Sequence, residues 1–321
     1  MQLRSQGTQH PSRIYSRDPD LHGSSKWATK NHLHQKGYGE GGRIFLGYGM
    51  AEANKGRAYC ITTNTQKHLL TVAPTRSGKL LTASMPRCLE HRGSLVALDV
   101  KDGELSLIAA RYRRDVLGHK VIIIDPWDLA CSKLGMPQSR FNIMDWLDPD
   151  NDDFVEDAMT VADSLVTDRG GKDPFWTDEA RALVMGLILY VAATPLVLMP
   201  TAKRSRDIPQ VRRLLSLSSD DFKKIVGGEY AEDEEGNAIL IKPGMMQSSN
   251  EYVRASAARI LNKASKEFSS ILSTAQQNTH FLESPKIQRT LSESDFTFEE
   301  LENSKTDIFV VLPAGRLFTY N

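Results

Sequence analysis

The sequence has no excess of either charge, since 40 Lys and Arg residues are balanced by 40 Asp and Glu residues. We therefore do not expect the whole surface to coat nucleic acid, because such binding grows with the number of phosphates that basic residues neutralise; a local basic channel stays open as an alternative. Cysteine is scarce as well: Cys60, Cys88 and Cys131 are odd in number and widely spaced. This pattern argues against a disulfide framework or a cysteine-based metal site and fits a reducing compartment.

Long hydrophobic runs are also rare. Residues 1–25 lack the apolar segment of a signal peptide. Residues 182–200 carry no charge and approach the length of a membrane span, but Pro195 interrupts them and the apolar pattern continues upstream through Phe175 and Trp176. We therefore predict a buried helix followed by a turn, and no transmembrane segment in this chain.

Short apolar runs separated by helical segments fill the first half of the chain. The predicted strands are 43–47, 68–72, 94–99 and 120–125. Residues 104–115 have apolar side chains at helical spacing, and a further helix starts at Gly78, which Pro86 is expected to end or kink. Continuous apolar strands that alternate with helices predict an α/β fold with a parallel sheet buried on both faces.

Helical periodicity then dominates to about residue 300, before a buried-type strand at 307–312. The predicted helices are 154–166, 177–193 with Thr177 as N-cap, 208–217, 220–225 and 250–281, and the acidic segment 229–241 is expected to form a loop or hairpin. We infer that an all-α domain is inserted into the α/β domain. The expected parts are a basic, weakly ordered lead-in over 1–42, the first part of a nucleotide-binding domain over 43–140, the all-α domain over 141–303, and the start of the returning nucleotide-binding part over 304–321.

The segment Ala73-Pro-Thr-Arg-Ser-Gly-Lys79 predicts a phosphate-binding loop between a strand and a helix. Small residues let backbone N–H groups approach phosphate oxygens, and Lys79 supplies a cation. The candidate nucleotide-binding residues are Ala73, Pro74, Thr75, Arg76, Ser77, Gly78, Lys79 and Leu80. Ala73 replaces the usual first Gly, and Leu80 replaces the Ser or Thr whose hydroxyl usually binds Mg²⁺. A tight turn with a solvated lysine is the structural alternative.

Two carboxylates end apolar strands, where an acid that holds Mg²⁺ is expected. Asp99 and Asp125 are the candidates, with a strand-end cap or a turn former as the alternative for each. The acidic run 148–153 fails the EF-hand pattern, since Asp153 and Met159 stand where Gly and Glu are required. No Ser/His/Asp or Cys/His nucleophile set is visible, so no catalytic residue and no protein-held metal site is assigned.

Several ordered stretches resemble the TraG/TraD-type coupling proteins of conjugative type IV secretion systems. They are the lead-in 21–29, the loop 73–79, the acidic element 99–104, the strand 120–126 with Phe141-Asn142, the segment 173–176 with Glu179-Ala180, and 264–275. The resemblance implies a RecA-like P-loop ATPase with an all-α domain, binding ATP and Mg²⁺ and assembled as a hexamer on the cytoplasmic side of the bacterial plasma membrane. Its implied partners are DNA with its relaxase, or a secreted protein, and the channel components of the secretion system.

The chain also departs from the family's usual pattern. We see neither the membrane anchor that members carry before this region nor, after 307–312, the Walker B strand with its adjacent acids. We therefore expect a fragment truncated at both ends, with an incomplete sheet, that binds ATP but does not hydrolyse it alone. The alternative is a non-catalytic substrate-recognition module with a silent nucleotide site.

Overall fold

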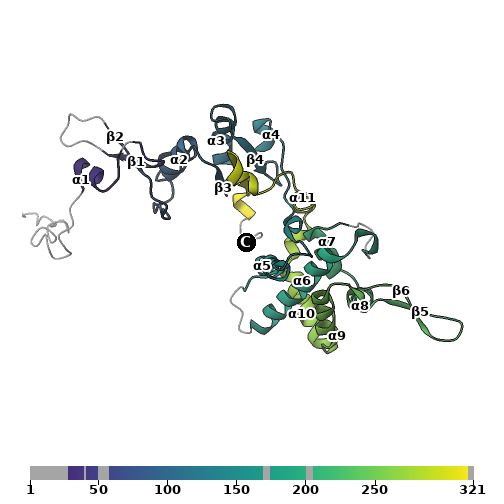
Figure 1. The fold of residues 1–321 in the computed structure, drawn as a ribbon. Coiled ribbons are helices and arrows are strands. Elements are labelled where there is room, and N and C mark those ends of the chain that lie inside the picture. Colours follow the sequence, from purple (N-terminus) through teal and green to yellow (C-terminus); the bar gives the residue numbers. More distant parts are fainter. Residues whose placement is uncertain (1–27, 40, 50–57, 169–173, 200–204, 317–321) are drawn as a thin grey trace, which may run out of the picture. The chain divides into compact units, whose positions relative to one another are not determined.

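The computed structural model describes residues 28–39, 41–49, 58–168, 174–199 and 205–316. The chain forms two compact units, Met1–His91 and Arg92–Asn321, which we call the N-terminal and C-terminal units (Figure 1). The predicted lead-in over 1–42 falls mostly outside the described residues. The predicted boundaries at 42, 140 and 303 stay predictions.

An antiparallel strand pair forms the base of the N-terminal unit. It consists of β1 (Ile44–Gly49), which confirms the predicted strand 43–47, and β2 (Tyr59–Thr63), which the sequence analysis did not identify; α1 (Lys30–Gln35) precedes them. A π-helical turn, η2 (Leu80–Ser84), leads directly into α2 (Met85–Glu90). The Arg87 Nε donates to the Phe45 carbonyl over 2.9 Å and so ties α2 to β1.

The predicted strand 68–72 is wrong, since these residues form neither strand nor helix. Their side chains are exposed, to 89% for Leu70 and 85% for Val72. An apolar run becomes a strand only where another strand accepts its backbone hydrogen bonds, and none of the described strands pairs with this segment. The segment is apolar in sequence, but it does not form the strand hydrogen bonds that its composition led us to expect.

A three-stranded parallel sheet in the order β3-β7-β4 forms the α/β part of the C-terminal unit. β3 (Leu95–Asp99), β4 (Lys120–Ile124) and β7 (Thr306–Val311) confirm the predicted strands 94–99, 120–125 and 307–312. Between β3 and β4 lies α3 (Glu104–Asp115), with the predicted bounds. β7 returns after the helical residues to pair between β3 and β4, so the chain is α/β with a parallel sheet interrupted in sequence by helices, as expected. The predicted burial on both faces is wrong for the edge strand β3, where Val96 and Leu98 are 57% and 63% exposed.

Helices α5 to α10 form what we call the helical domain (Figure 1), and the hydrophobic core around α6 extends to Trp127 after β4 and Leu312 after β7. Its helices are α5 (Phe154–Leu165), α6 (Pro174–Ala193), α7 (Ile208–Leu215), α8 (Ser219–Gly227), α9 (Glu251–Leu261) and α10 (Ser265–Asn278). The predicted helix over 177–193 forms the carboxyl part of α6 and is largely buried, with Leu187 and Ile188 fully covered. Among the described residues, no helix combines the length and hydropathy that crossing a bilayer requires.

The local predictions for Thr177, for the helix 250–281 and for the segment 229–241 have different outcomes. Thr177 is not an N-cap, because α6 already includes Pro174–Trp176, and proline is favoured in the first helical turn. The predicted helix 250–281 is wrong in its length: extended backbone at Ala264 separates α9 from α10, and each packs separately against α6. The segment 229–241 forms a hairpin of β5 (Glu229–Glu232) and β6 (Ala238–Lys242), as one of the two expected alternatives.

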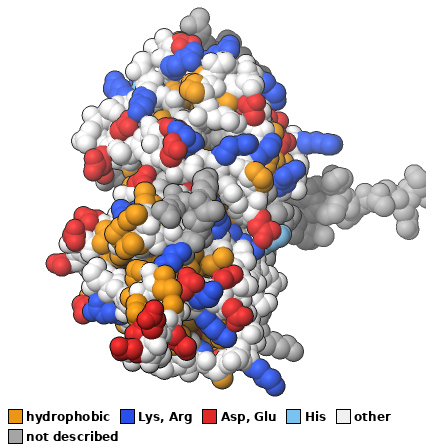
Figure 2. All heavy atoms as spheres, turned by 90° about the vertical axis from the view of Figure 1, so that its right-hand side faces the viewer, with side chains coloured by type: hydrophobic (Ala, Val, Ile, Leu, Met, Phe, Trp, Pro, Cys, Tyr) orange, Lys and Arg blue, Asp and Glu red, His pale blue; other side chains and the backbone are white. Residues whose placement is uncertain are grey.

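Short elements complete the C-terminal unit. They are α4 (Cys131–Leu134), η3 (Ile143–Trp146), η4 (Leu196–Leu198), η5 (Met245–Gln247), η6 (His280–Glu283), α11 (Pro285–Thr290), α12 (Glu299–Asn303) and η7 (Ala314–Arg316). On the face drawn in Figure 2, acidic and basic side chains are interspersed rather than segregated. This distribution agrees with the balanced composition and shows no broad basic stripe on that face.

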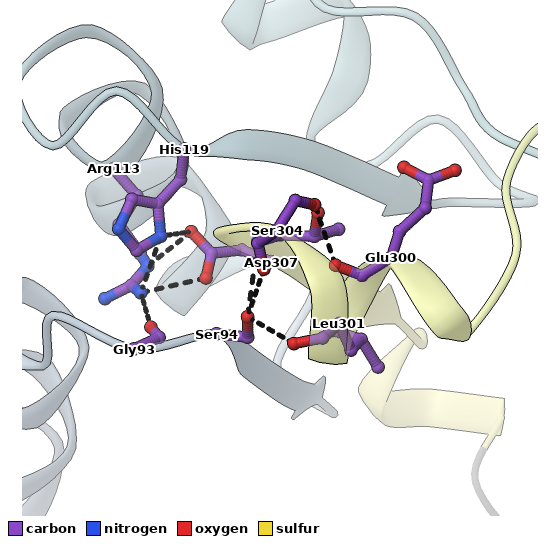
Figure 3. Close-up of polar contacts among 9 residues, drawn as sticks. Gly93, Ser94, Arg113, His119, Glu300, Leu301, Ser304 and Asp307 are labelled. Atoms are coloured by element: carbon purple, nitrogen blue, oxygen red, sulfur yellow. Dashed lines mark hydrogen bonds and ion pairs between the residues drawn. The ribbon is translucent and has the colours of Figure 1, made fainter.

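A buried ion cluster lies at the amino-terminal end of the parallel sheet (Figure 3). The Asp307 carboxylate of β7 accepts from Arg113 Nε over 2.6 Å and from Arg113 Nη2 over 2.8 Å, and it lies 3.0 Å from His119 Nδ1. The Arg113 and Asp307 side chains are both fully buried. The cluster therefore joins α3, the turn before β4, and β7 without contact with solvent.

Candidate nucleotide-binding site

The backbone of the loop 73–79 has the alternating handedness of an anion-binding turn. Arg76 and Gly78 have positive φ angles of 64° and 80°, whereas Lys79 follows with φ −53° and ψ −32° in the right-handed region. Consecutive residues of opposite hand turn their N–H groups toward one side and form a concave nest that suits a phosphate oxygen. Gly78 is needed for this turn, because a side chain disfavours its conformation.

The Lys79 side chain curls back over this loop. Its Nζ donates to the Ala73 carbonyl over 3.3 Å and to the Pro74 carbonyl over 3.4 Å. Both bonds are long and the side chain is exposed, so little holds the ammonium group away from an anion that enters the nest. A backbone bond from Ser77 N to the Pro74 carbonyl, 3.3 Å, closes the turn beneath it.

The residues that follow Lys79 offer little to a metal ion. Leu80 has no hydroxyl, and the Thr82 hydroxyl donates to the Gly78 carbonyl over 3.0 Å. We expected Pro86 either to end or to kink the helix. It does not end the helix, since α2 extends to Glu90. A π-helical turn immediately before Pro86 widens the backbone at the point where a proline lacks its N–H and crowds the preceding turn.

Asp99 caps the start of α3. Its Oδ2 accepts from the backbone N and the hydroxyl of Ser106, each over 2.8 Å, and its Oδ1 accepts from Lys101 N over 3.4 Å. The side chain is almost fully buried. The geometry favours the capping interpretation for Asp99, because its carboxylate oxygens are already occupied by donors of its own loop and helix.

Asp125 plays the equivalent part at the end of β4. Its carboxylate accepts from the backbone N of Leu129, Ala130 and Cys131 over 3.0, 2.8 and 3.1 Å. Burial, followed by the nearby Asp125, raises the pKa of the Cys131 thiol to about 12, so this cysteine is not a nucleophile near neutral pH. Asp125 therefore organises the turn into α4, and its proposed role toward Mg²⁺ stays a prediction.

Asp102 is a structural residue at this sheet edge that the sequence analysis did not assign. Its Oδ1 accepts from Ala314 N over 3.0 Å, and Asp99 O accepts from Leu312 N over 2.9 Å. These bonds join the loops that follow β3 and β7. The Asp102-Gly103 pair, with φ angles of 57° and 84°, is the turn signal from which the loop geometry could have been predicted.

The predicted site residues belong to two different units. The loop 73–79 and Leu80 lie in the N-terminal unit, whereas Asp99 and Asp125 lie in the C-terminal unit. Within the part of the chain that the structure describes, no group of three or more His, Cys, Asp or Glu side chains is arranged to hold a metal ion. The arrangement is thus a nest-forming turn beneath the exposed Lys79 side chain, together with two carboxylates used in capping.

Comparison with known proteins gives relatives along most of the chain. The chain is 27% identical over 310 residues to the conjugal transfer protein TraG of Escherichia coli, a match that covers 91% of this chain and 45% of that protein. It is 24% identical over 262 residues to the type IV secretion system-coupling protein VirD4 of Bartonella quintana, covering 79% of this chain and 36% of that protein. The chain therefore spans less than half the length of these relatives.

Solved structures of coupling proteins are also similar. The bacterial conjugative coupling protein TrwBdeltaN70 in complex with sulphate has a TM-score of 0.37 and 17% identity, over 72% of this chain and 49% of that one. The plasmid coupling protein TrwB in complex with the ATP analogue ADPNP gives a TM-score of 0.36 and 18% identity, over 72% and 50% of the two chains.

A family model also matches most of the chain. The family model described as Type IV secretory system Conjugative DNA transfer matches residues 26–319, which include the loop 73–79, the parallel sheet and the helical domain. The chain belongs to this family.

Proposed function

We propose that the chain is the nucleotide-binding part of a coupling protein of a conjugative type IV secretion system, with a RecA-like fold, and that it binds ATP through the loop 73–79. The observation that carries this proposal is the nest at Gly78 with the Lys79 ammonium over it. Relatives named as TraG and VirD4, and TrwB structures in complex with ADPNP and with ADP and Mg²⁺, support it.

The loop 73–79 offers suitable donors to a phosphate group, whereas the candidate residues offer few ligands to Mg²⁺. Backbone N–H groups and Lys79 would hold the phosphates, and Mg²⁺ would arrive bound to the nucleotide and supply charge neutralisation there. Leu80 brings no hydroxyl, and the carboxylates of Asp99 and Asp125 are committed to backbone donors. We therefore propose ATP binding by this chain without hydrolysis, and we assign Asp99 and Asp125 to capping.

Membership of the family is also the basis for proposing the location, assembly and substrates of the protein. We propose that the assembled protein works at the cytoplasmic face of the plasma membrane, as a hexamer, and hands DNA with its relaxase or a secreted protein to the secretion channel. The second candidate is a substrate-recognition module with a silent nucleotide site. Leu80 favours it, because the residue that usually completes the metal shell is absent.

Titration of the 321-residue chain with ATP, ADP and AMP in a calorimeter, with phosphate release followed in parallel, tests the proposal. We expect saturable binding of ATP and ADP, much weaker binding of AMP because it lacks the phosphates that reach Lys79, and no phosphate release above buffer. Absence of ATP binding would favour the silent-site candidate. Steady phosphate release would overturn the assignment of the two acids to capping.

A further inference from the structure

Two segments of the chain connect the parallel sheet to the helical domain, and they lie side by side. Residues 138–147 lead from β4 towards α5, and residues 291–298 lead back towards β7; we call them the two crossings. The backbone N of Arg140 donates to the Asp295 carboxylate over 2.8 Å, and the backbone N of Asp295 donates to the Arg140 carbonyl over 3.1 Å. The two crossings are therefore hydrogen-bonded to each other and are not independent linkers.

The Arg140 side chain reinforces this contact. Its Nε and Nη2 donate to the two carboxylate oxygens of Asp295 over 3.2 and 2.9 Å, and its Nη1 lies 2.6 Å from a carboxylate oxygen of Glu293. A guanidinium that meets both oxygens of a carboxylate fixes the orientation of the two groups. Both side chains are partly exposed, so this pair contributes more to geometry than to stability. It aligns one crossing on the other.

Four aromatic rings from the two crossings also pack together. The Phe141 ring is stacked on Phe296 with centroids 5.4 Å apart, and it meets Phe298 and Trp146 edge to face at 5.0 and 5.7 Å. Phe296 is buried in a hydrophobic cluster with apolar side chains of β4 and β7. Because aromatic pairs in these geometries contribute beyond the area that they bury, the rings attach both crossings firmly to the sheet.

The crossings are attached to the helical side as well. Phe141 N donates over 2.8 Å to the Thr290 carbonyl at the end of α11, which itself packs on the core around α6. The buried Asn142 side chain donates from Nδ2 to the Arg206 carbonyl, just before α7, over 2.8 Å. Its backbone N donates to the Ser294 hydroxyl over 3.0 Å, which adds a second bond between the crossings.

The backbone of the first crossing has little freedom to turn. Ser139 N donates to the Ile123 carbonyl of β4 over 2.8 Å, so each of the four residues 139–142 donates its backbone N–H to a group outside the crossing. Neither crossing contains glycine. A hinge is a short stretch whose φ and ψ angles change during motion, and such a change would break these consecutive bonds.

We propose that the two crossings form a rigid joint, through which the helical domain moves with β4 and β7 as one body and does not swing on its two connections. The pairing of Arg140 with Asp295 and the four-ring cluster hold this joint closed. The joint does not depend on ATP binding by the loop 73–79, so this inference and the proposed function can fail separately.

Distances between two spin labels on the full chain test the joint. Asp115→Cys on α3 and Ala255→Cys on α9 place a label at an exposed residue on each side of it, and Cys60→Ser removes the natural cysteine that is not buried. We expect double electron–electron resonance to give a single narrow distance distribution. Phe141→Ala combined with Asp295→Ala should broaden it roughly twofold, because both contacts between the crossings are then lost.

Trypsin gives a second readout, since cleavage after Arg140 requires that stretch of backbone to be released. Asp295→Ala removes the clamp on Arg140 and is expected to make cleavage of the Arg140–Phe141 bond about tenfold faster. Asp178→Ala is the matched control: Asp178 pairs with Arg181 within α6, and its loss should leave the distance distribution and the cleavage rate unchanged. Thermal unfolding of each variant separates opening of the joint from loss of the fold.

A broad or multiple distance distribution in the unchanged chain would overturn the proposal, because it would show a helical domain that swings on its connections. Equal cleavage after Arg140 in the unchanged chain and in Asp295→Ala would also overturn it. If the variant with Phe141→Ala does not fold, Asp295→Ala, at a partly exposed residue, decides through the cleavage rate alone.

Discussion

Asp307→Ala is expected to lower the free energy of unfolding by roughly 3–5 kcal/mol, which is a large share of the roughly 5–15 kcal/mol typical of a domain. The Arg113 guanidinium is fully buried and donates to both carboxylate oxygens of Asp307, over 2.6 and 2.8 Å, and to the Gly93 carbonyl over 2.8 Å. Without the carboxylate, the buried guanidinium of α3 would lose the counter-ion that Asp307 supplies, beside His119. The loss should fall on α3, β4 and β7 together, because the cluster joins all three.

Urea unfolding followed by circular dichroism measures this effect. Asp115→Ala is the control, since Asp115 pairs with Arg114 on the same helix but at the surface, and its removal should leave the midpoint unchanged. Arg113→Met with Asp307→Leu removes both charges and should be less destabilising than Asp307→Ala alone. Equal midpoints for Asp307→Ala and Asp115→Ala would contradict the assignment of a buried, charge-bearing cluster.

Lys79→Ala is expected to weaken ATP binding roughly 10- to 100-fold, the effect of losing a hydrogen bond between an ammonium group and a phosphate. Stability should not change, because Lys79 is exposed and its two contacts with loop carbonyls are long. The variant thus separates ligand binding from folding.

Calorimetric titration of the variant against the unchanged chain gives the ratio of dissociation constants. Lys67→Ala is the matched control, since Lys67 is also exposed in the N-terminal unit but lies outside the loop. ATP affinity that is equal in the unchanged chain, Lys67→Ala and Lys79→Ala would show that the nucleotide, if bound, does not use this loop.

The parallel sheet and α3 could be predicted because their signals are local. β3 and β4 are continuous apolar runs that end at Asp99 and Asp125, and Asp102-Gly103 marks the turn that starts α3. The return of β7 to the same sheet was also predictable, since its residues are as apolar as those of β3 and β4. The order β3-β7-β4 was not, because strand pairing is decided by contacts distant in sequence.

The incorrect structural predictions concern features that are determined by tertiary contacts. The run 68–72 has the hydrophobicity of a strand, yet no strand among the described residues accepts its hydrogen bonds. The burial of Arg113 could not be predicted from the helix alone, because it depends on Asp307, far along the chain. The break at Ala264 depends on how α9 and α10 pack on α6. The apolar periodicity of each helix does not reveal this packing. The candidate loop 73–79 was visible because its turn depends on its own residues.

Hydrogen–deuterium exchange with and without ATP tests the central claim most directly, since the backbone N–H groups of the loop are proposed to bind the phosphates. We predict that ATP slows exchange in the peptide spanning 73–82 and leaves the peptides around Asp99 and Asp125 unchanged. Protection around Asp99 or Asp125 with none at 73–82 would contradict the account.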